Sequence, residues 1–299
     1  MSVSADPDHL FRPGVRLAAS YFLQSADRIV RALNEDLGPA VVFLGIVWGN
    51  VANQAVGRAV AAEGAPVLDR RAPVSVVRLA ESLGLPFETV RRYAMRLQDA
   101  GFCERQSKGL VIPAEVFETP AFETCLSETW SATAQFGRDL EALGVVLPDP
   151  NPVQDDEAGR WVARYSARYF LKGLKLITES LDADLLTSMI FLAVNRANLS
   201  LLFADSDIAR AYGAPDAVRP DDFRRPVSVM EIAGTLRLPY ETTRRRVLGL
   251  VEMGACRRVG GGLIVPGAAL STPPVVKAMQ EAWRLTISFM GSVRKLGLQ

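Results

Sequence analysis

The sequence predicts a mainly α-helical protein with small β-wings, in which one structural unit occurs twice. Three observations lead to this fold class. Apolar residues recur at spacings of three and four over most of the chain, which is the period of a helix with one buried face. Residues 73–113 and 226–266 align without gaps, and 19 of these 41 positions are identical. In each copy the helical pattern gives way to two short runs around a glycine, as in a β-hairpin.

The chain begins with a segment that carries little periodicity. Residues 1–16 contain two prolines, a glycine and mixed charge, and they are expected to form a flexible arm. A helical pattern follows over 17–34, and the pair Gly38-Pro39 is expected to break the chain. The next helix, over about 40–62, is apolar on all sides in its first half. Such a helix belongs in a core or in a subunit interface.

The first copy of the repeated unit opens with two helices joined by a tight turn. Ser75 is suited to cap a short helix, and Gly84 is suited to end it. A longer helix over 86–100 has Pro86 in its opening turn and Gly101 at its C-terminal cap. One apolar stripe of this helix is expected to be buried, and it consists of Phe87, Val90, Ala94 and Leu97.

Arginines occupy the face of the longer helix that lies opposite this stripe. With about 3.6 residues per turn, Arg92 points directly away from the stripe and Arg91 lies at its shoulder. The second copy keeps Pro, Glu, Thr, Arg and Arg in register, so that Arg245 corresponds to Arg92. Mixed charge on an exposed helix face usually serves solubility alone. Packing does not require two adjacent arginines in both copies, and their retention therefore indicates a function.

A β-hairpin and a long amphipathic helix complete each copy. The hairpin turns are expected at Lys108-Gly109 in the first copy and at Gly260-Gly261-Gly262 in the second. A Pro-rich acidic stretch separates the two halves of the chain. The predicted division is a first repeat over 17–143, a linker over 144–159 and a second repeat over 160–299, with C-terminal helices at 120–143 and 273–297.

The charge of the chain is distributed unevenly between the repeated units and the rest. The net charge is +1, yet residues 70–113 hold eight basic and four acidic side chains, and residues 224–266 hold eight and three. The remainder of the chain is therefore strongly acidic. Two basic segments in an acidic body are typical of a protein that binds a polyanion locally.

Several classes of protein are disfavoured by the residues that are present. The three cysteines and the single histidine, His9, do not form a disulfide framework, a zinc site or a catalytic set. We therefore expect no enzyme activity, metal or cofactor. Cys103 and Cys256 are expected to be small buried side chains, with a redox switch as the alternative. The apolar run 41–48 is too short to span a bilayer, and the cysteine content favours the cytoplasm.

The residues of the repeated unit resemble a known family. The order Leu-Ala-x-x-Leu-x-Leu-Pro-x-Glu-Thr-x-Arg-Arg, followed by a hairpin, resembles the winged helix-turn-helix of bacterial transcription regulators, most of all the multiple-antibiotic-resistance-regulator type. The resemblance covers the 41 residues of each copy. It implies that the helices over 86–100 and 239–253 enter the major groove of DNA and that the hairpins reach phosphates. Family members usually carry one such domain and dimerise, whereas this chain carries two.

The predicted function is sequence-specific binding of double-stranded DNA by a nucleoid-associated transcription regulator that reads two related half-sites. Arginine pairs with guanine through two hydrogen bonds, which suits Arg92 and Arg245 to base reading. The first copy is expected to read further through Arg96, and the second to rely more on phosphates. The side chains expected to contact DNA are Thr89, Arg91, Arg92, Arg96, Lys108, Thr242, Arg244, Arg245, Arg246 and Arg257.

Alternatives remain for the function and for the helical body. Tandem winged helices also occur in protein-interaction subunits of the chromosome-condensation type and in replication initiators. The apolar helices over 40–62 and 184–204 are expected to pack across the two copies, which makes one chain the equivalent of a dimer. A pocket for a small-molecule effector between these helices is the alternative to a plain core, and further homodimerisation stays open.

Overall fold

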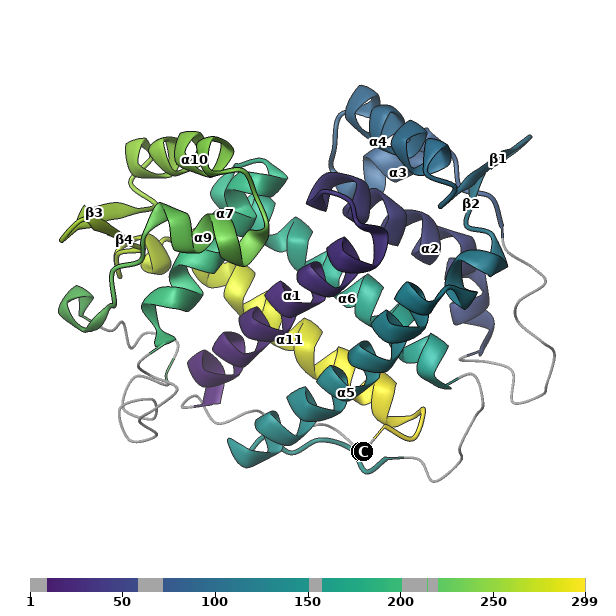
Figure 1. Cartoon of the computed structure of the whole chain (residues 1–299). Coiled ribbons are helices and arrows are strands. Elements are labelled where there is room, and N and C mark those ends of the chain that lie inside the picture. Colours follow the sequence, from purple (N-terminus) through teal and green to yellow (C-terminus); the bar gives the residue numbers. More distant parts are fainter. Residues whose placement is uncertain (1–9, 59–71, 151–157, 201–213, 215–219, 299) are drawn as a thin grey trace.

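The computed structural model describes residues 10–58, 72–150, 158–200, 214 and 220–298 (Figure 1). It is mainly helical with two small antiparallel sheets, which confirms the predicted class of a mainly α protein with β-wings. The first half contains α1 (Phe11–Leu33), α2 (Leu37–Arg58), α3 (Val76–Leu83), α4 (Phe87–Asp99), β1 (Glu104–Gln106), β2 (Gly109–Val111), the 3-10 helix η3 (Ala114–Glu118) and α5 (Pro120–Ala142). The second half contains α6 (Ala158–Leu181), α7 (Leu185–Asn198), η5 (Asp221–Phe223), α9 (Val229–Leu236), α10 (Tyr240–Glu252), β3 (Arg257–Val259), β4 (Gly262–Ile264), η6 (Ala269–Ser271) and α11 (Pro273–Arg294).

The first helix is longer than the sequence predicts. It begins at Phe11, so that residues 11–16 belong to α1 and not to the predicted arm, the rest of which lies outside the described residues. Pro13 falls in the first turn, where the backbone N–H has no partner in the helix anyway. Gly14 brings α1 close to the C-terminal helix, because a Cβ there would lie 2.2 Å from the ring of Trp283. Packing on the distant half of the chain thus extends the helix.

The predicted break at Gly38-Pro39 is also wrong. Both residues lie in the first turn of α2, where proline is tolerated. The actual separation of α1 from α2 occurs at Asn34, which adopts a left-handed conformation with φ 50° and ends α1. Gly38 allows close approach of α4, since a Cβ at this position would meet the ring of Tyr93 at 2.5 Å. The predicted C-terminal end of α2, at about residue 62, lies outside the described residues.

Local signals set the helix pair of each unit as predicted. Ser75 caps α3 by accepting a hydrogen bond from the backbone N–H of Arg78 at 3.2 Å, and Gly84 ends it with φ 64°. Ser228 caps α9 in the same way at 3.1 Å. Arg237 takes the place of the glycine and adopts φ 51°, which costs more for a residue with a Cβ.

The two hairpins are antiparallel, and an asparagine fixes each of them to a helix of the body, which is α2 in the first half and α7 in the second. In the first half, Asn50 of α2 donates to the carbonyls of Ala72 and Leu110 at 2.9 and 3.0 Å, and it accepts from Ile112 N–H at 3.1 Å. In the second half, Asn198 makes the same three bonds, to Arg225 O, Leu263 O and Val265 N–H. We refer to residues 73–113 and 226–266, with their helix pair and hairpin, as the first and second units.

The two halves share one hydrophobic centre. Phe22 and Phe170, from α1 and α6, stack with ring centroids 4.4 Å apart. The hydroxyl of Tyr21 lies 2.7 Å from that of Thr133, and in the other half the hydroxyl of Tyr169 lies 2.8 Å from that of Thr286. The helices α1, α5, α6 and α11 cross in this centre, while the two units lie outside it (Figure 1). The Phe22–Phe170 stack and the contact of the Tyr21 hydroxyl with that of Ser166, at 2.8 Å, join the two halves.

Candidate nucleic-acid interface

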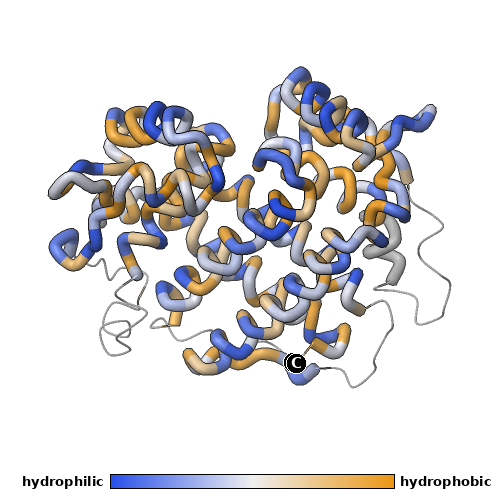
Figure 2. Tube along the Cα trace, in the orientation of Figure 1, coloured by the Kyte–Doolittle hydropathy of each residue, from blue (hydrophilic) through white to orange (hydrophobic). Residues whose placement is uncertain are grey.

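The helices α4 and α10 lie along the same edge of the molecule, and each presents an arginine face to solvent (Figure 1). Val90, Ala94 and Leu97 bury the opposite face of α4 in the first half. Thr243, Val247 and Leu250 do the same for α10. Hydrophilic residues lie along the outer edge of both units, and hydrophobic residues lie where the helices of the body cross (Figure 2).

Arg92 and Arg245 are the exposed arginines at the centre of these faces. Arg92 lies over the ring of Tyr93, with its guanidinium carbon 5.4 Å from the ring centroid. Within the described residues neither arginine forms an ion pair with a carboxylate. Both guanidinium groups therefore keep their planar donor edges available to a ligand, at the same position of each helix.

The neighbouring arginines are held by an acidic residue one turn earlier. Arg91 pairs with Glu88 at 2.8 Å, and Arg244 pairs with Glu241 at 3.0 Å. Both pairs are largely exposed to solvent, and such pairs contribute little free energy. They orient the arginines along the helix surface.

The predicted role of Arg96 as the residue that reads furthest is not supported by its surroundings. Arg96 forms an ion pair with Glu35 and a second one with Asp36, at 3.2 Å, in the turn before α2. Burial would lower the pKa of Arg96, but the hydrogen bond and charge of Asp36, together with Glu35, raise it. The guanidinium is thus directed toward the body of the protein. The sequence did not reveal this pairing, because Glu35 and Asp36 are distant in the chain.

Arg246 in the second unit forms the corresponding link to the body. It pairs with Asp184, which caps α7 by accepting from the N–H groups of Leu186 and Thr187. Asp184 corresponds to Asp36, although Arg246 corresponds to Tyr93 and not to Arg96. Each unit is therefore tied to the body by an aspartate before the second helix, through an arginine at a different position of α4 or α10.

The remaining predicted residues lie around these faces. Thr89 and Thr242 are half-buried on α4 and α10, and Lys108 is exposed at the tip of the first hairpin. Arg257 is exposed on β3 but pairs with Asp221 at 2.8 Å. Gly260 and Gly261 form the turn of the second hairpin with φ 54° and 80°, as the glycine run predicts.

Residues at two further equivalent positions were missed by the sequence analysis. Arg105 on β1 and Arg258 on β3 are exposed, occupy the same place in each hairpin and form no ion pair with the described residues. Their retention in both copies was the available signal.

Phe87 was expected to be buried, but it is 45% exposed, and Tyr240 at the same position is 43% exposed. These rings lie at the first residue of each helix, where no other element covers them.

The described residues add three facts about other kinds of site. Cys103 and Cys256 are buried, and burial raises the pKa of each thiol to about 12. This keeps both thiols protonated and agrees with the predicted structural role. Within the described ranges, no cluster of His, Cys, Asp or Glu could hold a metal ion. None of the described helices is both long enough and apolar enough to cross a membrane.

Comparisons of the chain with models of protein families, with curated proteins and with solved structures found no match.

Proposed function

We propose that this protein is a transcription regulator that binds double-stranded DNA in a sequence-specific manner with two winged helix-turn-helix units. The observation that carries the proposal is the pair of equivalent arginines, Arg92 and Arg245, exposed at the centre of α4 and α10 on one edge of the molecule. An α-helix fits the major groove, and arginine is the side chain that most often reads guanine there.

The surroundings of these arginines support the same proposal. The exposed rings of Phe87 and Tyr240 lie at the first residue of the same helices and could contact thymine methyl groups. Arg105 and Arg258 place one positive charge on each hairpin, where it could reach a phosphate. The basic charge of both units would then face the same polyanion.

We further propose that the two units arose by internal duplication. Nearly half of the aligned positions are identical, and Asn50 and Asn198 make the same three hydrogen bonds. A homodimer reads a palindrome, whereas two units in one chain can diverge. The half-sites should be related through the guanine read by Arg92 and Arg245, and they should differ around it.

We expect the two half-sites to differ at positions other than those read by Arg96 and Arg246. Arg96 and Arg246 are both tied to aspartates of the body, so neither is placed for base reading. Two other differences between the copies, Lys108 against Gly261 and Met95 against Leu248, should then distinguish the half-sites. The side chains of Met95 and Leu248 are 47% and 37% exposed.

Selection of binding sites from a random pool of DNA duplexes tests the proposal. An R92A/R245A variant should bind the selected site with a loss of about 1–3 kcal/mol for each arginine and with relaxed specificity. An R138A variant, which removes an exposed arginine from α5, is the control and should bind like the parent. The proposal is wrong if R92A/R245A binds the selected site as tightly as the parent does.

Two other uses of the same units give different results in such experiments. A protein-interaction subunit would select no duplex from the pool. A replication initiator would select one, but its occupancy across a genome would concentrate at an origin and not at promoters. The exposed arginines at the centre of α4 and α10 favour DNA over a protein partner, because both units are basic within an acidic chain, as is typical of surfaces that bind a polyanion.

A further inference from the structure

Two cavities lie between the halves of the chain, and equivalent residues line them. The first cavity, of about 110 Å³, lies among α1, α2, η3 and α5 of the first half and α6 of the second. The second cavity, of about 140 Å³, lies among α6, α7, η6 and α11 of the second half and α1 of the first. Each cavity thus takes one wall from the opposite half, and a molecule inside it would contact both halves.

The two cavities differ in polarity at five equivalent positions. The first cavity has hydrogen-bonding side chains there, which we call its polar end: Ser25, Arg28, Cys125, Thr129 and Ser166. The second cavity has residues with no polar side-chain atom at the corresponding positions: Gly173, Leu176, Ala278, Ala282 and Ala18. The second cavity has arginines at other positions, and three of them already have partners: Arg12 donates to Ala214 O, Arg196 donates to Ser20 Oγ, and Arg224 pairs with Asp221.

Arg28 is the charged group of the polar end. It is only 6% exposed, its Nη2 donates to Ser25 Oγ at 2.8 Å, and its guanidinium lies 5.5 Å from the centroid of the Tyr21 ring. Its Nε has no hydrogen-bond partner. A buried charge is unfavourable unless an opposite charge pairs with it.

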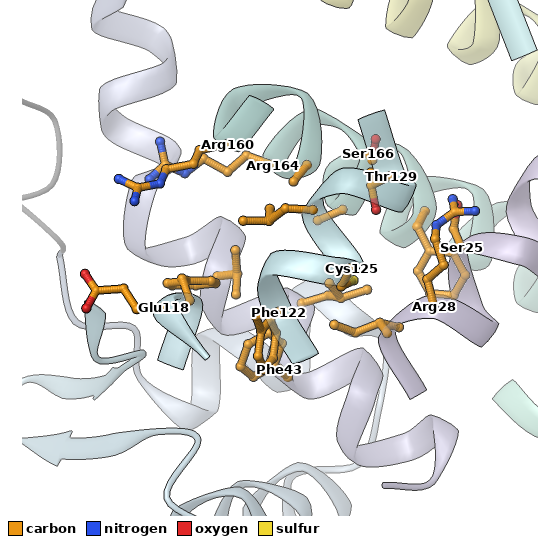
Figure 3. A pocket seen from close by; sticks show the side chains of 18 of the residues that line it. Ser25, Arg28, Phe43, Glu118, Phe122, Cys125, Thr129, Arg160, Arg164 and Ser166 are labelled. Atoms are coloured by element: carbon orange, nitrogen blue, oxygen red, sulfur yellow. The ribbon is translucent and has the colours of Figure 1, made fainter. Parts of the chain in front are cut away.

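No carboxylate of the described residues supplies that charge. Asp27 and Glu128 lie beside Arg28 in the adjoining surface, and both pair with Arg31 instead. Glu118 also lines the first cavity, but on the side away from Arg28 (Figure 3). Asp27 also pairs with Arg237 of the second unit. The positive charge of Arg28 at the edge of the first cavity is therefore suited to an anionic group from a bound molecule.

The rest of the first cavity is mostly apolar, with Glu118, Arg160 and Arg164 as its other charged lining residues. Phe43, Phe122 and Phe170 contribute aromatic walls, and Arg160 lies at the side opposite Arg28 (Figure 3). An apolar cavity of about 150 Å³ in another protein holds one benzene molecule. The first cavity accordingly fits an apolar body of about one ring or a chain of similar volume.

We propose that the first cavity binds a small monocarboxylic acid, whose carboxylate pairs with Arg28 and whose apolar body packs against Phe43, Phe122 and Phe170. We expect no such acid in the second cavity, because Leu176 stands at the position of Arg28 and Arg12, Arg196 and Arg224 bind other groups of the chain. One chain then takes one acid, held between its two halves. This inference does not depend on the proposed binding of DNA.

Titration calorimetry of the full chain without DNA tests the site. The probes are hexanoate and benzoate, and their neutral counterparts are hexanamide and benzamide. We expect one site per chain for the acids and at least about tenfold weaker binding of the amides, because hydrogen bonds to a charged group are the stronger kind. Equal affinities for acid and amide, two equal sites per chain, or no binding of either acid at millimolar concentration would each overturn the proposal.

Substitutions locate the acid in the first cavity. R28L, which copies Leu176 of the second cavity, should weaken acid binding at least about tenfold and leave amide binding unchanged. R196L, which removes an arginine from the second cavity, is the matched control and should bind acids like the parent. R28K keeps the charge without the planar fork and should lie between the two. Acid binding by a folded R28L or R28K as tight as in the parent would contradict the assignment.

Discussion

Replacing Asn50 with alanine should release the first hairpin from the body without affecting the second. The Asn50 side chain is 3% exposed and bonds to three backbone groups on two segments that are distant in the sequence. Alanine removes these bonds and leaves the carbonyls of Ala72 and Leu110 and the N–H of Ile112 without this partner. The hairpin would then be held by its own ladder, by its apolar contacts and by the two backbone hydrogen bonds between Val74 and Leu110.

The magnitude follows from the number of bonds. Each intramolecular hydrogen bond contributes a net free energy of about 0.5–1.5 kcal/mol, so that three bonds contribute about 3 kcal/mol. A factor of ten in an equilibrium constant corresponds to about 1.4 kcal/mol. The equilibrium for local opening of the hairpin should therefore shift toward the open state by about a hundredfold.

Amide hydrogen exchange measures this opening segment by segment. In N50A the amides of 104–112 should exchange much faster, while those of 257–265 should keep the rate of the parent. N198A is the matched control and should give the reverse pattern. Equal loss of protection in both hairpins, or no loss in 104–112, would refute the argument that the asparagine holds its own hairpin.

Two other substitutions test the packing between the halves. Gly14→Ala places a Cβ 2.2 Å from the Trp283 ring and should lower the unfolding free energy by about 1–3 kcal/mol. Gly249→Ala, whose Cβ meets no atom within 4 Å, should raise the unfolding free energy by up to about 1 kcal/mol. Thermal unfolding compares the two variants, and a G14A as stable as G249A would contradict the packing. Burial raises the pKa of Asp27, but hydrogen bonds from Arg237 and Arg31 outweigh it and lower the pKa below 3.8. Because the folded value lies below the unfolded one, the ionised carboxylate stabilises the fold above pH 3.8 and this contribution is lost as the pH falls through the folded value. The stability difference between the parent and D27N should therefore shrink on acidification, and a difference independent of pH would contradict the pairing.

The parts of the fold that the sequence predicts are those with local signals. Ser75 and Ser228 cap their helices as predicted, because a serine side chain reaches the N–H three residues later without help from other elements. The hairpins follow from the glycines at their turns and from the short runs on either side of them. Their pairing needs only residues within eight positions of one another, such as Glu104 and Val111.

The parts that it does not predict depend on contacts between distant segments. Pro13 and Gly14 are residues that normally disfavour a helix, yet α1 includes them because Gly14 packs against Trp283. The position of Arg96 on the helical wheel shows that it is exposed, but not that Glu35 and Asp36 lie within reach. The cavities between the halves could not be predicted either, because each combines residues from several helices of both halves, whose relative position the sequence does not give.

The stacking of Phe22 on Phe170 also bears on how the protein behaves on dilution. If the two halves were separate chains, this contact would form only above a certain protein concentration, since association depends on concentration. Here both rings belong to one chain, and their effective concentration is set by the connection between the halves. The spacing of α4 and α10 is consequently the same for a single molecule as for a concentrated solution, so that a cell needs no minimum copy number to maintain it.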